Sequence, residues 1–314
     1  MKFFNNQYLK ETKYLFQKIH FFFREKFTKN LFSKILFKKK NTIKLDSLQL
    51  ELIESIKTKG FAKVSIDELF QNKQNYKQEF NELVKEIKKT GNYKDALNFF
   101  NNNSEKSGKH YIHRIHDNKN FSIDINSILL KFILSDKILE IVNSYFEMYA
   151  KLNTADLWIT FFKNNASTRK NAQRWHRDRD DTKILKIFLY LEEVNEDNGA
   201  TEYVMYSKRG QKYSHLSKFS YGNIASWKVY PDEKKVDEKV EEKDKVVFRG
   251  KPGTLYFVDT TGMHRGGFSG KIGERIFGYW SFLSPASLLQ NKNYIIPKKN
   301  ELKSLNFNQR AALE

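Results

Sequence analysis

A histidine and a carboxylate stand two residues apart in the segment Gln173-Arg174-Trp175-His176-Arg177-Asp178. Side chains alternate along an extended backbone, so His176 and Asp178 are expected to point to the same face of a strand. A third metal ligand must then come from elsewhere, and His264 in the glycine-flanked segment 262–267 can supply it. Two imidazoles and one carboxylate leave open positions on an octahedral ion, which iron(II) needs to bind a bidentate co-substrate and dioxygen. We therefore predict a mononuclear iron(II) site made by His176, Asp178 and His264.

A His-x-Asp tripeptide alone is common, and the predicted elements around it are what make this one informative. An apolar strand is expected over residues 184–191, followed by the Asn198-Gly199 turn and a short strand over 202–206. A strand over 253–259 and a tight turn lead to His264, and a strand over 275–283 begins with Arg275. The periodicity is typical of strands from Asp156 onward and of helices before it, over residues 45–56, 76–98 and 126–150.

This order of motifs resembles the phytanoyl-CoA dioxygenase family of iron(II)/2-oxoglutarate-dependent oxygenases, over roughly residues 45–285. The resemblance is carried by Trp175-His176-Arg177-Asp178, Asn198-Gly199, Gly253-Thr254-Leu255, His264 and Arg275. It implies a mainly β protein with flanking α-helices, in which a double-stranded β-helix (a cupin-like jelly roll of two four-stranded sheets) follows N-terminal helices. It also implies iron(II) as cofactor, 2-oxoglutarate and dioxygen as co-substrates, and a hydroxylation reaction.

The resemblance gives Arg275 the task of binding the far carboxylate of 2-oxoglutarate. A planar guanidinium can hold a carboxylate through two parallel hydrogen bonds, and Arg275 stands eleven residues after His264, as the family's co-substrate arginine does. Arg265 is the competing candidate, but it adjoins a ligand and would point to the opposite face.

Further candidate residues flank the ligands. Trp158 and Thr160, on the strand over residues 157–162, are expected to approach the co-substrate. Phe188 and Tyr190 share one face of their strand and either line the co-substrate cavity or belong to the ordinary core.

Arg169, Gln173 and Arg174 precede the ligand strand, where a substrate would touch them. Together with Arg177 and Arg179, the arginines would make the mouth of the site basic and favour an acidic substrate. His110, His113 and His116 lack a supporting carboxylate cluster and are expected to be surface residues or part of a substrate lid.

Other chemistries are excluded by missing residues. The chain has no cysteine, so it has no disulfide, thiolate metal site or cysteine nucleophile. His176-Arg177-Asp178 is not a kinase catalytic loop, because Lys183 stands where that loop has asparagine. Related halogenases have a small residue in place of the carboxylate ligand, whereas Asp178 is present here.

The net charge is +19, and the first forty residues carry eleven Lys and Arg against Glu11 and Glu25. Apolar residues recur there at steps of three and four, among them Leu15, Phe16, Ile19, Phe23 and Phe27, as in a basic amphipathic helix. Such a helix suits an anionic membrane surface, a partner, or packing on the domain itself. An AT-rich genome would raise the lysine content without any functional meaning.

We divide the chain into a basic helical extension (1–40), an oxygenase domain (41–310) and a remnant of an added tag (311–314). The alternating charges of residues 231–245 predict a solvated loop or short helix inserted in the domain. No apolar run reaches the roughly 20 residues that span a bilayer, and no leader pattern opens the chain. A cytoplasmic protein, peripheral at the inner face of a membrane, is therefore expected.

The function predicted from the sequence is hydroxylation of an acidic small-molecule, carrier-linked or lipid-linked substrate, for example a glycolipid sugar, at a membrane surface. The alternative from another class is a non-catalytic basic protein that binds nucleic acid or membrane on the same fold. An oxygenase that acts on protein or nucleic acid is a third hypothesis, although nucleic acid is not the expected partner. The sequence does not determine an oligomeric state.

Overall fold

The computed structural model describes residues 19, 23, 29–40, 44–71, 73–103, 112–115, 124–162, 168–217, 230–269, 271, 273–287 and 302–314. The prediction of an amphipathic helix over the first 28 residues, apart from Ile19 and Phe23, lies outside these residues, and so do His110 and His116.

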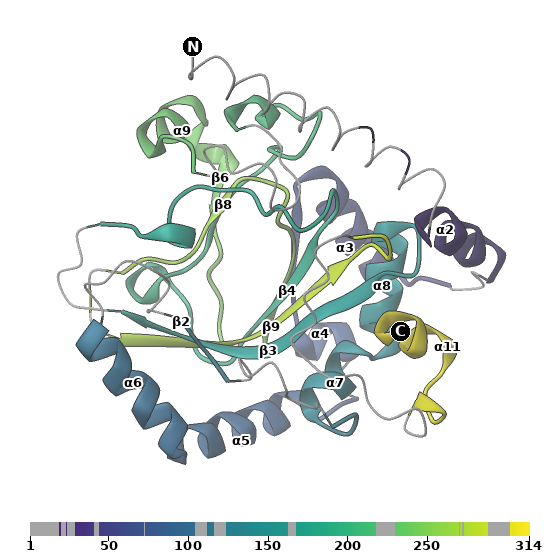
Figure 1. Ribbon diagram of the computed structural model, residues 1–314, viewed down its shortest axis with the longest axis horizontal. Coiled ribbons are helices and arrows are strands. Elements are labelled where there is room, and N and C mark those ends of the chain that lie inside the picture. Colours follow the sequence, from purple (N-terminus) through teal and green to yellow (C-terminus); the bar gives the residue numbers. More distant parts are fainter. Residues whose placement is uncertain are drawn as a thin grey trace, which may run out of the picture.

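Two antiparallel sheets form the centre of the molecule (Figure 1). The larger has six strands in the order β1-β7-β4-β9-β3-β2, with the following bounds: β1 (Phe61–Ser65), β2 (Ile112–Arg114), β3 (Lys151–Phe162), β4 (Leu185–Tyr190), β7 (Thr254–Asp259) and β9 (Gly273–Leu283). The smaller has the order β6-β5-β8, with these bounds: β5 (Glu202–Val204), β6 (Lys245–Val247) and β8 (His264–Arg265). The predicted jelly-roll fold is confirmed.

The sizes of the sheets differ from the expected four strands each. β1 and β2 add themselves to the two edges of the larger sheet. In the smaller sheet the next position beyond β8 is a single β-bridge, between His176 and His264. The ligand segment therefore belongs to the smaller sheet, although it is too short there to form a regular strand.

The alternation of side chains along β4 explains how the larger sheet is packed. Leu185, Ile187 and Leu189 belong to the core shared with the helices, whereas Phe188 and Tyr190 belong to a second cluster between the two sheets. Aromatic rings dominate this second cluster, which includes Tyr203, Phe248, Tyr256, Phe277 and Tyr279. The interior of the jelly roll is therefore a largely aromatic space.

Helices cover the outer face of the larger sheet, and in Figure 1 α3, α4, α7 and α8 gather on one side of β3, β4 and β9. The helices of the described residues have these bounds: α2 (Lys29–Lys40), α3 (Ser47–Thr58), α4 (Ile66–Phe70), α5 (Tyr76–Lys89), α6 (Gly91–Asn103), α7 (Ile128–Ile133), α8 (Asp136–Phe146), α9 (Glu233–Lys239) and α11 (Phe307–Leu313). Short 3-10 turns lie at 171–173, 196–198, 214–216 and 242–244. None of the described helices combines the length and the apolar character that crossing a lipid bilayer requires.

The two long helical patterns each form two helices. Thr90 has extended backbone angles (φ −70°, ψ 150°) and separates α5 from α6, and Ser135 (φ −60°, ψ 145°) separates α7 from α8. Regular structure extends into the polar stretch 101–120, because α6 continues to Asn103 and residues 112–114 form β2 against β3. The strand predicted over 202–206 ends at Val204, since Tyr206 has a positive φ of 56° and turns the chain.

Gly60 ends the turn between α3 and β1 and lies against the interior of the barrel. Its φ of 97° is in the region that favours glycine, and a Cβ at this position would lie 2.2 Å from the Tyr203 hydroxyl oxygen. That hydroxyl donates a hydrogen bond of 2.9 Å to the backbone oxygen of Asp259, at the end of β7. Gly60 thus lets the helical layer close directly onto the two sheets.

Residues 311–313, which the sequence analysis separated from the oxygenase domain, form the end of α11 and pack on that domain. Ala312 and Leu313 are fully buried, and the Lys151 ammonium on β3 donates a hydrogen bond of 2.6 Å to the backbone oxygen of Ala311.

Candidate metal centre

The backbone holds the two candidate histidine ligands side by side. The N–H of His176 donates to the carbonyl of His264 at 2.8 Å, and the N–H of His264 donates back to the carbonyl of His176 at 3.0 Å. Their rings lie with centroids 4.2 Å apart. Asp178 is fixed two residues further along, because its N–H donates to the carbonyl of Thr260 at 2.9 Å. The predicted ligands are thus brought together from two distant parts of the chain.

Each imidazole has its Nδ1 within hydrogen-bond distance of a carbonyl two residues before it. His176 Nδ1 lies 2.8 Å from the oxygen of Arg174, and His264 Nδ1 lies 3.0 Å from the oxygen of Gly262. A carbonyl can only accept, so each Nδ1 carries the proton and each Nε2 keeps its lone pair. This is the tautomer that a metal ion needs when it binds through Nε2.

The protonation states also suit a metal ion. Burial, helped by His264, lowers the pKa of His176 to about 3, and burial lowers the pKa of His264 as well, so both rings stay neutral at neutral pH. Burial alone would raise the pKa of the Asp178 carboxyl, but the Lys186 ammonium holds it well below its usual range. The site therefore offers two neutral nitrogen donors and one carboxylate.

These donors fit a hexacoordinate ion with open positions. One ligand atom from each of His176, Asp178 and His264 lies within 4.8 Å of the other two. Among the residues that the structure describes, no other group of three histidine or acidic side chains has its ligand atoms this close together. Because only three protein donors meet here, an iron(II) ion would keep positions for other ligands.

Lys186 is a member of the site that the sequence reasoning missed. Its Nζ lies 2.5 Å from Asp178 Oδ2 and 5.4 Å from the centre of the Tyr279 ring, and 13% of its side chain is exposed. The sequence could have indicated this residue. Side chains two residues apart on a strand point to the same face, so Lys186 shares the inward face of β4 with Phe188 and Tyr190.

The residues predicted to bind the co-substrate come from neighbouring strands of the larger sheet. Trp158 and Thr160 lie on β3, and Thr160 pairs directly with Arg275 on β9. Trp158 stacks on Tyr279 with ring centroids 3.8 Å apart, and its buried Nε1 has no hydrogen-bond partner among the residues that the structure describes. Such an unpaired donor in the interior is what a polar ligand would satisfy.

Phe188 and Tyr190 lie on β4, and both are buried in the aromatic cluster between the sheets. Phe188 stacks against Tyr279, and the Tyr190 hydroxyl donates a hydrogen bond of 2.8 Å to the carbonyl of Phe248. Both side chains line the interior of the barrel, and the Tyr190 hydroxyl proton is already used in a hydrogen bond within the protein.

Arg275 is buried, with 5% of its surface exposed. Its guanidinium carbon lies 4.7 Å from the centre of the Phe277 ring, and its Nη1 donates to the carbonyl of Gly199. The glycine turn after His264 permits this arrangement, because a Cβ at Gly267 would lie 1.3 Å from Gly199 O and 2.8 Å from Arg275 Nη1.

The three residues predicted to touch substrate make different contacts within the protein. Arg169 pairs with Glu202 at 2.7 Å, and the buried Gln173 exchanges hydrogen bonds with the backbone of Lys170 and Gly267. Arg174 lies over the Tyr230 ring at 5.2 Å, and Tyr230 in turn lies 5.8 Å from the ring of His176. Arg174 is therefore the member of this set that remains beside the metal ligands.

The expectation that Arg177 contributes to a basic mouth is wrong. Arg177 is 4% exposed, and its guanidinium donates to the backbone carbonyls of Ser207, Thr261 and Tyr213. It points away from the face that His176 and Asp178 share, as alternation along an extended segment requires.

The charged segment 231–245 is not simply solvated, and this corrects the interpretation of its charge pattern. Glu233 at the start of α9 accepts a hydrogen bond of 2.5 Å from the N–H of Trp175 and one of 3.0 Å from Arg265. Asp237, one turn later, accepts from Trp175 Nε1 at 3.0 Å. Trp175 precedes one histidine ligand and Arg265 follows the other, so α9 binds both ligand segments at once.

Trp175 and Arg265 also contact each other directly. The Arg265 guanidinium lies 4.2 Å from the centre of the Trp175 ring, and its Nη2 lies 2.6 Å from Glu202. Arg265 thus points to the outer side of the smaller sheet, as predicted. A half-buried, charged network therefore supports the ligand pair from behind.

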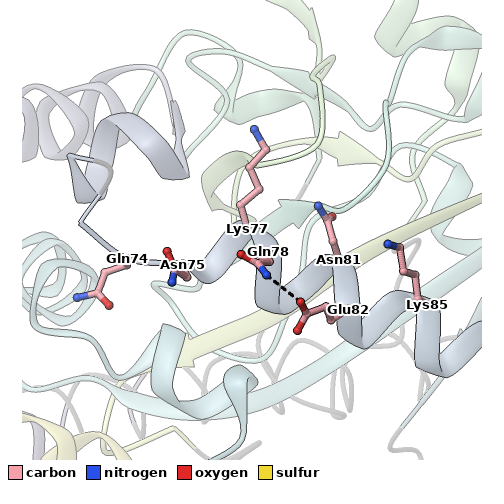
Figure 2. Close-up of a pocket in the computed structure, with 7 residues that line it drawn as sticks. All are labelled: Gln74, Asn75, Lys77, Gln78, Asn81, Glu82 and Lys85. Carbon is pink, nitrogen blue, oxygen red and sulfur yellow. Dashed lines mark hydrogen bonds between the residues drawn. The ribbon is translucent and has the colours of Figure 1, made fainter.

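Two further features lie apart from this centre. His113 is half-buried on β2, opposite Ile159 of β3. Figure 2 shows a surface hollow along α5, lined by the exposed residues Gln74, Asn75, Lys77, Gln78, Asn81, Glu82 and Lys85. These side chains come from one helix and the residues before it, and none belongs to the ligand group, so we assign the hollow no catalytic role.

Comparison with known families decides the class of protein. The profile of the phytanoyl-CoA dioxygenase (PhyH) family matches residues 60–270, about two thirds of the chain. The chain belongs to the phytanoyl-CoA dioxygenase family. It is accordingly a non-haem iron oxygenase of the 2-oxoglutarate-dependent class, whose members use iron(II), 2-oxoglutarate and dioxygen.

Solved structures similar to this phytanoyl-CoA dioxygenase family member share little sequence with it. AviO1 from Streptomyces viridochromogenes is 13% identical, with a TM-score of 0.47 over 78% of this chain and 98% of that chain. EctD from S. alaskensis, solved with 2-oxoglutarate and 5-hydroxyectoine, is 13% identical, with a TM-score of 0.47 over 82% of both chains. HygX from Streptomyces hygroscopicus, solved with nickel and 2-oxoglutarate, is 12% identical, with a TM-score of 0.44 over 77% and 88%. No curated protein matches the sequence.

The contacts of α9 predict that an acid remote from the metal controls its affinity. Glu233→Ala removes the acceptor shared by Trp175 and Arg265, so the two histidine segments lose a common support, and Mn(II) affinity should fall about tenfold. Isothermal titration of the metal-free protein measures this. Glu238→Ala on the same helix is the matched control, because Glu238 is exposed and contacts only Lys234, at 3.8 Å, among the ion pairs described. Equal Mn(II) affinity in both variants would remove α9 from this role.

Proposed function

We propose that this oxygenase hydroxylates an acidic small-molecule, carrier-linked or lipid-linked substrate at a membrane surface. In this proposal His176, Asp178 and His264 hold iron(II), and Arg275 fixes the distal carboxylate of 2-oxoglutarate. The observation that carries the assignment of the ligands is the pair of imidazoles whose Nε2 atoms are left free beside an ionised carboxylate. Iron(II) with 2-oxoglutarate and dioxygen supplies the oxidising chemistry, while the side chains hold and orient the reactants.

The surroundings of Arg275 support its part in the proposal. Its buried guanidinium donates to Gly199 O and lies against the Phe277 ring, on the inner face of the larger sheet. A buried cation in this position suits a carboxylate ligand. Thr160 faces it from the paired position on β3, so a hydroxyl is available to the same carboxylate. A carboxylate bound there would lie on the inner face of the larger sheet, the face that also carries Lys186.

Removing single ligands tests the cofactor assignment. Anaerobic addition of Fe(II) and 2-oxoglutarate to the metal-free protein should give the weak visible charge-transfer band of the chelate. His176→Ala should abolish the band, and Arg275→Met should require at least about tenfold more 2-oxoglutarate, because the charge-assisted contact is lost. Arg249→Met is the control, since Arg249 is an exposed arginine paired with Glu196. An unchanged 2-oxoglutarate requirement in Arg275→Met would assign the distal carboxylate to another residue.

Cationic side chains beside the ligands and beside Trp158 support an acidic substrate. Arg174 lies over Tyr230 beside His176, and Arg114 on β2 lies 4.8 Å from the centre of the Trp158 ring. Lys186 adds a third cation on the inward face. Cationic groups around a low-dielectric site favour anionic ligands.

Paired substrates test the preference for acids. Candidate carboxylic acids and their neutral amides would be compared by the release of succinate that depends on substrate. The acids should be turned over faster, and Arg174→Ala should raise KM for the acids more than for the amides. Equal turnover of acids and amides would contradict an acidic substrate.

Helix α2 supports the membrane part of the proposal. Asn30, Ser33 and Phe37 dock it on the domain, through hydrogen bonds of Asn30 with Ser284 and Ala286 and of Ser33 with Tyr149. The opposite face leaves Phe32 and Ile35 exposed at 69% and 55% of their surface. Exposed lysines (Lys29, Lys38, Lys39 and Lys40) lie on the same helix. Apolar anchors among lysines suit a bilayer with anionic lipids.

Vesicle binding tests the role of α2 without deleting the docked helix. The full chain should co-float with phosphatidylcholine vesicles that contain about one quarter phosphatidylglycerol, and less with pure phosphatidylcholine. Phe32→Glu combined with Ile35→Glu should abolish this binding. Phe99→Glu is the matched control, because Phe99 on α6 is 52% exposed but lies in a different helix. Equal flotation of the double variant would refute the α2 surface.

A further inference from the structure

Lys186 is unusual because a lysine occupies an inward position of a barrel whose interior is largely aromatic. It precedes Phe188 and Tyr190 on the inner face of β4, and its neighbours across the sheet are Val258 on β7 and Ser281 on β9. Lysine side chains are rarely buried unless they are paired with a carboxylate. Here the paired carboxylate is Asp178, at 2.5 Å from the ammonium.

The contact divides the Asp178 carboxylate into two different oxygens. Oδ2 contacts the Lys186 ammonium, whereas Oδ1 lies on the side of His176, 3.9 Å from its Nε2. Oδ2 also lies 3.7 Å from His264 Nε2. A carboxylate that keeps one oxygen on an ammonium has the other oxygen for a metal ion.

We propose that Lys186 is a positioning residue that reserves Oδ2 of Asp178, so that a metal ion receives this carboxylate through Oδ1 alone. The proposal rests on the proposed metal site. A carboxylate that binds through both oxygens fills two coordination positions of the metal ion. Binding through Oδ1 alone therefore leaves one of these positions open. A chelating 2-oxo acid needs two adjacent open positions and dioxygen needs a third. Lys186 would thus favour binding of the co-substrate at the expense of affinity for the metal ion itself.

The opposite signs of these two effects make the inference testable. An ammonium close to the ligand atoms repels a divalent cation and shares the charge of its carboxylate ligand. Lys186→Met removes both effects, so the variant should bind Mn(II) about tenfold more tightly than the natural protein. With both oxygens of Asp178 free to bind, the Mn(II)-loaded variant should bind 2-oxoglutarate about tenfold more weakly.

Isothermal titration of Mn(II) into metal-free protein, and then of 2-oxoglutarate into Mn(II)-loaded protein, measures both affinities without turnover. Lys186→Arg keeps the cation and should restore both values towards those of the natural protein. Lys186→Gln keeps a hydrogen-bond donor without the charge, and it should match Lys186→Met in Mn(II) affinity; it also serves if the methionine variant does not fold. Lys208→Met is the matched control, because Lys208 has the same 13% side-chain exposure and faces the buried Asp259 at 3.7 Å. It should leave both affinities unchanged.

Thermal unfolding gives an independent readout. Without metal, Lys186→Met leaves the carboxylate of Asp178 without its cation, so the melting temperature should fall, and Mn(II) should raise it by more than in the natural protein. Weaker Mn(II) binding in Lys186→Met, or unchanged 2-oxoglutarate affinity, would overturn the inference while leaving the metal site in place. Absence of Mn(II) binding in the natural protein would instead overturn the proposed metal site, and this inference with it.

Discussion

The reciprocal backbone hydrogen bonds between His176 and His264 are the constraint on which the site depends. Residues that exchange both N–H···O bonds are directly opposite each other across an antiparallel pair, so their side chains leave the same face together. Each histidine is near a tight turn, and neither segment could set the separation of the two rings alone. The rest of the smaller sheet extends this bridge, because His264 pairs on its other side with Tyr203 of β5. The aromatic interior then packs against a ligand pair that the backbone has already placed.

Support for this pair comes from charges on both sides of the smaller sheet. Behind it, Glu233 and Asp237 of α9 bind Trp175 and Arg265, which adjoin the ligands in sequence. In front of it, Lys186 meets Asp178 on the inward side. Buried ion pairs contribute little net stability, since desolvation offsets most of their attraction, but losing one partner is costly. Such pairs are therefore better suited to fixing positions than to stabilising the fold.

Alternation along extended segments allowed much of this site to be predicted. It correctly placed His176 and Asp178 on one face. The same argument would have placed Lys186 on the inward face with Phe188, and Arg177 on the side away from the ligands, but these two positions were not predicted. Periodicity cannot reveal the partners of α9, because Glu233 lies 58 residues from Trp175 and its charged neighbours are typical of a solvent-exposed surface. The extra edge strand β2 was equally hidden, since three residues in a polar stretch gain a strand conformation only by pairing with β3.

The hydrogen bonds of the imidazole Nδ1 atoms go to the main chain, two residues back in each case, at Arg174 and Gly262. No substitution of a neighbouring side chain can delete a carbonyl oxygen, so the tautomer of both ligands is insulated from sequence drift. The residues that face a substrate can then change freely during evolution, or in the laboratory, without altering how the histidines present their lone pairs. In such a scaffold the metal-binding chemistry is fixed by the main chain, whereas the substrate specificity is set by side chains that can change independently.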